Sequence, residues 1–367
     1  MSTVSEQNEA SLAADRSFWS GQRVFLTGHT GFKGSWLGLM LEQFGAEVHG
    51  FSLPPLSDCA IAAVPQYARS VHGDIRDRNA LNEAMTEARP SVVLHLAAQP
   101  LVRQSYSDPR ETIETNVIGT MNVLEAVRGV DTVRAVLVVT TDKCYENKEW
   151  LWGYRETESL GGYDPYSASK ACAEIVTASW RNSFLGSDGI DDRQVCVASA
   201  RAGNVIGGGD VSADRLVPDV IRALAGEEAV VLRNPLAVRP WQHVLEPLHG
   251  YLQLARKLMS DEGSSFCEAY NFGPAENDCR PVGEVVELLC EHWGGGQWTL
   301  DASHQPHEAH LLKLDSSKAR ARLGWKTRWS LSDAIAEIVR WEQQHLKGQD
   351  LRACSLDSLN RYHESKA

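Results

Sequence analysis

The sequence predicts an α/β protein with a doubly wound parallel sheet and a smaller α/β part interlaced with it toward the C-terminus. From residue 23 onward, short β-branched runs alternate with longer amphipathic segments, which is typical of βαβ units. A glycine-rich turn joins the first such run to the first amphipathic segment. After residue 204 the alternation loosens into glycine-rich and proline-rich pieces. Together these observations indicate a Rossmann-type sheet followed by an irregular part.

The elements can be placed in order along the chain. Buried strands are expected at 23–27, 46–51, 68–72, 91–96, 134–140 and 194–200. Helices are expected between and after them at 34–44, 78–88, 109–128 and 165–184. The later part should hold a strand at 229–232 and helices at 282–293 and 330–345. Two apolar segments, 241–259 and 269–272, should return to the main sheet.

Both chain ends are expected to be solvated tails, at residues 1–20 and 351–367. The first twenty residues carry Glu6, Glu9 and Asp15 and have no apolar run after a basic start, so they do not resemble a secretion signal. No stretch approaches the roughly 18 consecutive apolar residues of a membrane helix. We therefore expect no membrane association.

Composition excludes several classes of protein. With 43% hydrophobic and 23% charged residues, the 367-residue chain can bury a sizeable core. Its net charge of -12 argues against a nucleic-acid partner, because phosphate-backbone binding needs a basic field. The eight cysteines are scattered without a C-x-x-C pair, which favours reduced thiols and a cytoplasmic location.

A histidine triplet, His304, His307 and His310, has a spacing that invites comparison with metal sites. Pro306 interrupts any helix that would align the three imidazoles. We therefore expect a solvated loop and no metal.

The turn after the first strand has the composition of a phosphate-binding loop. Gly28, Gly31 and Gly34 recur at three-residue intervals between a strand and a helix that should begin near Gly34. Glycines let the backbone approach a pyrophosphate, and the helix N-terminus offers free N–H groups with a partial positive charge. The alternative is an ordinary tight turn.

A second pattern carries acid–base chemistry. Tyr166 and Lys170 form Y-x-x-x-K at the start of an expected helix, and this spacing places phenol and ammonium on one helix face. Since an unperturbed phenol has a pKa near 10, a neighbouring cation is needed to favour the phenolate at neutral pH. The alternative is a surface helix pair.

These motifs resemble the extended short-chain dehydrogenase/reductases of the NAD-dependent epimerase/dehydratase group, over residues 18–350. The resemblance implies NAD, although the second strand ends without the acid that usually holds the ribose. Asn116 matches a structural asparagine of the superfamily, and Asp74 matches an adenine-contacting position but has a helix cap as its alternative. The implied cofactor-lining residues are Gly28, Thr30, Gly31, Phe32, Lys33, Gly34, Asp74, Ile75, Leu96, Ala97, Ala98, Gln99, Thr140, Tyr166 and Lys170.

Within that group, the segment Asp142-Lys143-Cys144-Tyr145 resembles the sugar-nucleotide 4,6-dehydratases, and in particular those that act on CDP-glucose. The resemblance implies that Asp142 protonates the departing 6-hydroxyl, that Lys143 removes the C5 proton, and that Thr141 binds the sugar oxygen. It also implies substrate contacts by Thr141, Asn204, Arg215 and Arg239, where arginine's planar fork suits phosphate oxygens. From sequence alone, either arginine is equally compatible with a surface position.

The same resemblance implies a domain division and an assembly. Residues 21–203 and about 240–273 should bind NAD, and about 204–239 and 274–350 the sugar nucleotide. The long helices at 109–128 and 165–184 correspond to those that pair subunits, so a homodimer or homotetramer is expected. Two alternatives stay open, namely a 4-epimerase or another 4,6-dehydratase acting on a dTDP-, GDP- or UDP-sugar, and a non-catalytic Rossmann binding protein.

Overall fold

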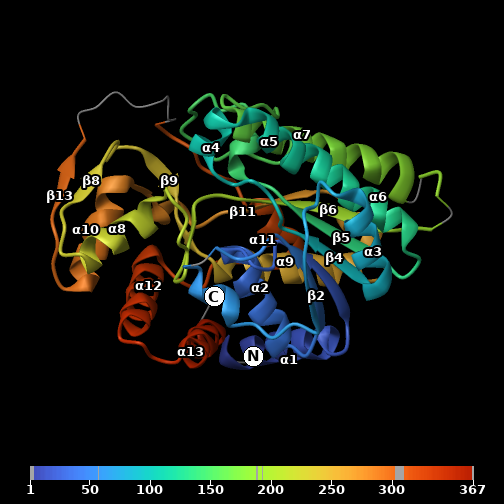
Figure 1. The fold of residues 1–367 in the computed structure, drawn as a ribbon, viewed down its shortest axis with the longest axis horizontal. Coiled ribbons are helices and arrows are strands. Elements are labelled where there is room, and N and C mark those ends of the chain that lie inside the picture. Colours follow the sequence, from blue (N-terminus) through green and yellow to red (C-terminus); the bar gives the residue numbers. More distant parts are fainter. Residues whose placement is uncertain (1–3, 57, 187–188, 192, 302–309, 366–367) are drawn as a thin grey trace.

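The computed structural model describes residues 4–56, 58–186, 189–191, 193–301 and 310–365. Its main sheet is parallel throughout, in the order β3-β2-β1-β4-β5-β6-β11 (Figure 1). The strands are β1 (Arg23–Thr27), β2 (Glu47–Ser52), β3 (Arg69–His72), β4 (Val92–His95), β5 (Ala135–Val139), β6 (Cys196–Ala202) and β11 (Ala269–Phe272). The predicted sheet is confirmed, and its order reverses between β1 and β4, where ligands of doubly wound sheets bind.

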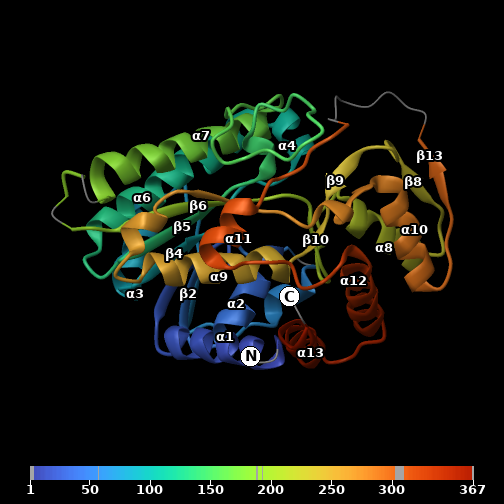
Figure 2. The same ribbon diagram turned by 180° about the vertical axis from the view of Figure 1, so that it is seen from behind.

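Helices cover both faces of this sheet because successive strand residues point to opposite sides. On β1, Val24 and Leu26 pack with α2 (Phe32–Gln43) and α9 (Leu245–Leu258), whereas Phe25 packs with the helices of the other face. Those helices are α3 (Arg78–Ala88), α6 (Gly119–Gly129) and α7 (Pro165–Trp180). The apolar segment at 241–259 thus returns to the sheet mainly as the covering helix α9, which Figure 2 shows from behind.

Of the two long predicted helices, the first is interrupted by a wider π-turn and the second ends in one. The first consists of α5 (Pro109–Ile113), η2 (Glu114–Ile118) and α6, and the second of α7 and η4 (Arg181–Leu185). Within η2, the Asn116 amide donates to the Ser169 hydroxyl at 2.9 Å and to the Gln99 carbonyl at 3.0 Å. Widened turns of this kind are frequent at functional sites. Through Asn116, the widened turn is hydrogen-bonded to Gln99 in the segment after β4.

The smaller part has its own core. Val220, Val285, Ile335 and Ile338 are fully buried together, between helices and short strand pairs. The helices are α8 (Leu216–Ala225), α10 (Val282–Trp293) and α12 (Leu331–Leu346). The strand pairs are β7 (Val205–Ile206) with β10 (Gln242–His243), β8 (Val230–Leu232) with β13 (Trp298–Leu300), and β9 (Val238–Pro240) with β12 (Cys279–Pro281). The remaining elements are η1 (Ala60–Ala63), α4 (Val102–Ser107), η3 (Asp142–Cys144), η5 (Gly263–Phe266), η6 (Glu276–Asp278) and α11 (Ser317–Leu323).

The prediction of two solvated tails was wrong. Residues 4–19 form α1 (Val4–Trp19), and residues 351–364 form α13 (Leu351–Glu364), which contacts α1. Trp19 and Tyr362 are fully buried, and the Tyr362 hydroxyl donates to Glu246 on α9 at 2.9 Å. The acidic residues near the N-terminus led to the prediction of a tail, whereas the helix packs against a helix formed more than 300 residues later in the chain.

Among the described residues, no helix is long and apolar enough to cross a membrane. All eight cysteines lie in the described part of the chain as free thiols. His304 and His307 of the histidine triplet fall outside the described residues, and His310 is exposed.

Candidate active site

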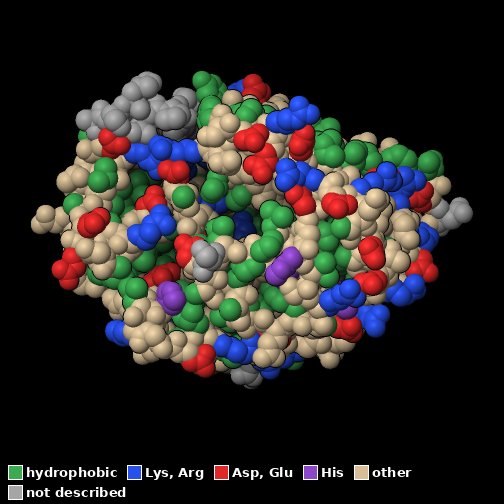
Figure 3. All heavy atoms as spheres, in the orientation of Figure 1, with side chains coloured by type: hydrophobic (Ala, Val, Ile, Leu, Met, Phe, Trp, Pro, Cys, Tyr) green, Lys and Arg blue, Asp and Glu red, His purple; other side chains and the backbone are tan. Residues whose placement is uncertain are grey.

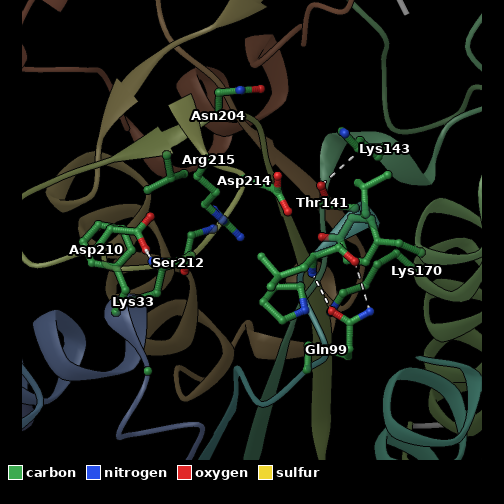
Figure 4. Close-up of a pocket in the computed structure, with 18 of the residues that line it drawn as sticks. Lys33, Gln99, Thr141, Lys143, Lys170, Asn204, Asp210, Ser212, Asp214 and Arg215 are labelled. Atoms are coloured by element: carbon green, nitrogen blue, oxygen red, sulfur yellow. Dashed lines mark hydrogen bonds between the residues drawn. The ribbon is translucent and has the colours of Figure 1, made fainter. Parts of the chain in front are cut away.

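The predicted site residues line one cavity of about 1190 Å³ at the carboxyl end of the main sheet. Figure 3 shows the molecule hollowed near the middle of this face, with basic side chains inside the hollow. In Figure 4, Lys33, Asp210 and Arg215 lie on one side, and Thr141, Lys143 and Lys170 on the other. The lining includes Gly28, Thr30, Gly31, Phe32, Lys33, Gly34, Asp74, Ile75, Leu96, Ala97, Ala98, Gln99, Thr140, Thr141, Asp142, Lys143, Tyr166, Lys170, Asn204, Arg215 and Arg239.

The glycine loop brings bare backbone to the cavity wall. Gly28 has a φ of +77°, and a Cβ there would lie 2.7 Å from the Ala97 nitrogen. The helix begins at Phe32, two residues earlier than predicted, with Gly31 as an N-cap that makes no side-chain capping bond. Gly34 therefore lies inside the first turn, where a Cβ would meet the Gly28 carbonyl oxygen at 2.0 Å. The loop and the uncapped helix start form an anion-binding cradle.

The end of β2, which lacks an acid, is polar through hydroxyl groups. Thr30 Oγ1 lies 2.8 Å from Ser52 Oγ and donates to the Leu53 carbonyl at 2.8 Å. Ser52 was not predicted as a site residue, although its position at the end of β2 was a signal that it lines the cavity.

Asp74 does not cap a helix, since Asp77 accepts the capping bonds of α3. Instead, Asp74 accepts hydrogen bonds from the Arg76 backbone and guanidinium, the shortest at 2.6 Å. Arg76 also lines the cavity and was missed. It lies after β3, whereas a basic residue that contacts the cofactor was sought at the end of β2.

The reactive groups gather where β5 ends. Thr141 caps the short turn η3, and its hydroxyl donates to Asp142 Oδ1 at 2.9 Å. Asp142 is 2% exposed, and its Oδ2 has no hydrogen-bond partner among the described residues. Tyr166 stands in the first turn of α7, which Asp164 caps, and Lys170 follows one turn later. The turn and the helix thus present Thr141, Asp142, Tyr166 and Lys170 to the same space.

Burial sets the proton affinities of these groups. It raises the pKa of Asp142, against the opposing charges of Lys143, Arg239 and Lys33. It raises the pKa of Tyr166 to about 12, although the charge of Arg215 and a hydrogen bond with Thr141 oppose the shift. A buried carboxyl group that holds its proton more tightly than usual is suited to act as an acid.

Two lysines of the cavity, Lys33 and Lys170, have pKa values shifted in the opposite direction. Burial lowers the pKa of Lys170 to about 8, an effect that the charge of Glu174 partly offsets. Burial, Arg215 and Lys170 together lower the pKa of Lys33 to about 7. Several cations therefore converge in one enclosed space, where an anion would relieve their mutual repulsion.

Cationic groups mark the wall formed by the smaller part. Arg239 of β9 is only 4% exposed, so it is not a surface residue. Its guanidinium donates to the Val238 carbonyl at 2.9 Å. Arg215 is half-buried at the N-cap of α8, and Asn204 lies between β6 and β7. These three residues suit an anion that spans the two parts of the protein.

Glu174 is a buried charge behind the cavity that sequence reasoning also missed. It lies four residues after Lys170 and is 4% exposed. The spacing was a usable signal, because the i, i+4 rule extends the face of Tyr166 and Lys170 by one more turn.

The fold and the lining of the cavity define a Rossmann-fold protein of the short-chain dehydrogenase/reductase class. The profile of the GDP-mannose 4,6 dehydratase family matches residues 25–338. The chain belongs to this family of sugar-nucleotide 4,6-dehydratases.

Individual relatives agree with that assignment. The chain is 49% identical over 354 residues to a CDP-glucose 4,6-dehydratase of Salmonella typhimurium, covering 95% of this chain and 98% of that protein. It is 29% identical to a dTDP-glucose 4,6-dehydratase of Xanthomonas campestris, covering 74% of this chain and 78% of that protein.

Solved structures share the fold. DesIV of Streptomyces venezuelae, a dTDP-glucose 4,6-dehydratase with NAD and TYD bound, superposes with a TM-score of 0.76 at 24% identity, covering 90% of this chain and 99% of that one. MoeE5 in complex with UDP-glucose and NAD superposes with a TM-score of 0.75 at 25% identity, covering 89% of this chain and all of that one.

Proposed function

We propose that this protein removes water from CDP-glucose to give CDP-4-dehydro-6-deoxy-glucose, with NAD as its cofactor. The observation that carries the proposal is the buried carboxyl of Asp142 at the end of β5, which accepts a hydrogen bond from Thr141 and lines the same cavity as Tyr166. A 4-epimerase needs the tyrosine but has no use for an acid at this place. The relative from Salmonella typhimurium, nearly half identical over its whole length, supports cytidine as the base.

The cavity fits a dinucleotide. The cradle from Gly28 to Gly34 has no room for a Cβ at its two ends, which suits a pyrophosphate in contact with backbone N–H groups. Asp74, Ile75 and the segment 96–99 would line the rest of the cofactor site. When bound, NAD supplies the acceptor for the C4 hydride and the donor that returns it to C6.

Tyr166 takes the proton of the sugar 4-hydroxyl. Burial alone makes its phenol a weak acid, so Lys170 and the other cations of the cavity are needed to stabilise the phenolate. The Thr141 hydroxyl forms a hydrogen bond with the same sugar oxygen and orients it. The product of this step is a 4-keto sugar.

Asp142 and Lys143 complete the loss of water. The 4-keto group makes the C5 proton acidic, and Lys143, half-buried on the cavity wall, removes it. Asp142 gives its proton to the 6-hydroxyl, which leaves as water. The raised pKa of Asp142 favours the protonated form that this step requires.

Arg215, Arg239 and Asn204 bind the diphosphate of the substrate. The protein carries a net charge of -12, so a dianionic ligand must be attracted by local cations. The predicted domain division follows the same logic, with residues 21–203 and about 240–273 for the cofactor, and about 204–239 and 274–350 for the sugar nucleotide. The cytoplasmic location stays a prediction.

We also propose a homodimer that pairs through the helices at 109–129 and 165–185. Ile113, Ile118 and Ile175 on these helices are between 39% and 57% exposed. Apolar side chains on neighbouring helices form a surface that a second copy would cover.

CDP-glucose deuterated at C4 tests the proposed reaction. Mass spectrometry of the product should find the loss of one water, with the deuterium at C6. Tyr166→Phe should abolish this product, because no base remains for the 4-hydroxyl. A product of unchanged mass would indicate an epimerase, and turnover by Tyr166→Phe at the wild-type rate would remove the assigned base.

A further inference from the structure

An ion pair lies directly behind the cavity. Arg201 on β6 donates from Nη2 to Glu174 Oε2 on α7 at 2.8 Å, and both side chains are at least 96% buried. Neither residue takes part in the proposed reaction. The attraction within a buried ion pair offsets the cost of desolvating both charges only when further hydrogen bonds satisfy both partners. The other hydrogen-bond partners of this pair therefore indicate which part of the structure it stabilises.

Those partners include both ends of the segment that carries the reactive groups. At its start, the Thr140 hydroxyl donates to Glu174 Oε1. At its end, Arg201 Nη1 donates to the Tyr145 hydroxyl at 2.8 Å, and the guanidinium lies over the Tyr145 ring at 4.9 Å. Thr141, Asp142 and Lys143 stand between these two anchored residues. One ion pair thus contacts the first and last residues of 140–145.

The Tyr145 end is fixed to the rest of the fold. Its hydroxyl donates to Asn271 Oδ1 on β11 at 2.7 Å. The Asn271 amide in turn donates to the Tyr154 carbonyl at 2.8 Å and to the Asp315 carbonyl at 3.1 Å. Since Tyr145 is 1% exposed, water cannot replace these bonds at little cost.

We propose that Glu174 and Arg201 are positioning residues, which clamp segment 140–145 from both ends and so hold Asp142 and Lys143 against C5 and C6 of the sugar. The inference rests on the roles given to Asp142 and Lys143 in the proposed function. A displacement of about 1 Å at a reacting group costs on the order of 100-fold in rate. A clamp on the turn should therefore control the loss of water more than the binding of substrate.

Tyr145→Phe tests the clamp with the smallest change. The variant keeps the ring, its stacking on Tyr154 and its contact with the guanidinium, and loses only the hydroxyl. We expect kcat for water loss to fall about 10- to 100-fold with KM within about twofold of the wild type. Bound reduced nicotinamide should accumulate, because oxidation at C4 continues while elimination is slow.

Thr140 offers the same test at the other end. Thr140→Val should lower kcat in the same way, and Thr140→Ser, which keeps the hydroxyl, should restore it. A purely structural role would lower every step in proportion to the folded fraction, and no reduced nicotinamide would build up.

Ser199→Ala is the matched control. Ser199 on β6 donates to the same Glu174 carboxylate at 2.6 Å but lies outside the segment 140–145. Its loss should lower the melting temperature about as much as Tyr145→Phe does, with kcat within about twofold of the wild type. Hydrogen exchange of the amides of 140–145 should rise in Tyr145→Phe and not in Ser199→Ala.

The outcomes separate the two proposals. If the wild type fails to convert CDP-glucose, the proposed function falls, while the exchange experiment still measures the clamp. If the wild type is active and Tyr145→Phe matches it, or Ser199→Ala loses as much kcat as Tyr145→Phe, the clamp is overturned.

Discussion

At the scale of single residues, the proposed role of Asp142 as the acid leads to the most specific prediction. Asp142→Asn keeps the size of the side chain but removes the proton that the 6-hydroxyl needs. Oxidation at C4 should continue, while water loss falls about 100-fold or more. Rapid-mixing absorbance of reduced nicotinamide, together with product mass, measures both steps. Water loss at the wild-type rate would show that the acid lies elsewhere.

Lys170 links the reaction to stability. Its pKa is lowered from 10.5 to about 8 by burial, so between about pH 8 and 10.5 the unfolded chain binds more protons than the folded chain. The contribution of Lys170 to the free energy of unfolding therefore rises with pH between about 8 and 10.5. Below about pH 8 the buried ammonium destabilises the folded protein. Lys170→Met should lose activity, yet at pH 7 it should be more stable by on the order of 2 kcal/mol.

Denaturant unfolding at pH 7 and at pH 10 measures this effect. The advantage of Lys170→Met should shrink as the pH approaches 10. Lys148→Met, at a half-exposed lysine of the cavity rim, is the control and should leave stability unchanged at both values. An equal gain from Lys148→Met would show that the effect is one of charge number and not of burial.

Tyr166, Lys170 and the glycines were predicted because each belongs to a spacing with a local physical reason, and Asp142 was predicted from the family resemblance; the structure places all of them on one cavity. Glu174 was missed although its spacing from Lys170 was a local signal, whereas its partners, Thr140 after β5 and Ser199 and Arg201 on β6, are brought to it only by the sheet. The pKa shifts of the site residues could not be predicted from the sequence either, because they depend on how deeply the fold buries each group.

At the scale of elements, the start of α2 can be tested with a pair of glycines. Gly34→Ala places a Cβ 2.0 Å from the Gly28 carbonyl, so the loop must shift and NAD affinity should fall at least tenfold. Gly129→Ala at the end of α6 meets nothing within 4 Å and should bind NAD like the wild type. Calorimetric titration with NAD measures both. Equal affinities would mean that the loop does not hold the cofactor.

Element boundaries were predictable where the stop signals are local. The bounds of α3 match because Asp77 caps its start and Arg89 ends it in a left-handed conformation. The interruption of the helix at 109–128 could not be predicted, because the bonds of Asn116 reach Gln99 and Ser169, which are distant in sequence. The helical periodicity of the sequence does not indicate hydrogen-bond partners outside the helix.

At the scale of the whole molecule, the proposed dimer predicts a change of mass. Ile118→Lys together with Ile175→Lys puts two charges on the apolar helix surface and should yield a monomer. Sedimentation velocity measures the mass. Leu236→Lys, at an 81% exposed leucine of the smaller part, is the control and should leave the assembly intact. A dimer that survives both changes would place the interface elsewhere.

The chain ends are where sequence reasoning failed at this scale. Neither α1 nor α13 was predicted, and each contacts the other across more than 300 residues of sequence. Long-range pairing of this kind leaves no periodic signature within either segment.

The contact between α1 and α13 has a consequence for the order in which the protein is made. Helix α1 packs against a helix that is synthesised more than 300 residues later, and β11 adds the edge strand of the main sheet only after the chain has passed residue 272. Helix α1 must therefore wait for α13 before this contact can form. In a nascent chain this contact stays open until α13 has been made, so shielding by a chaperone would matter most for products that stop short of this helix.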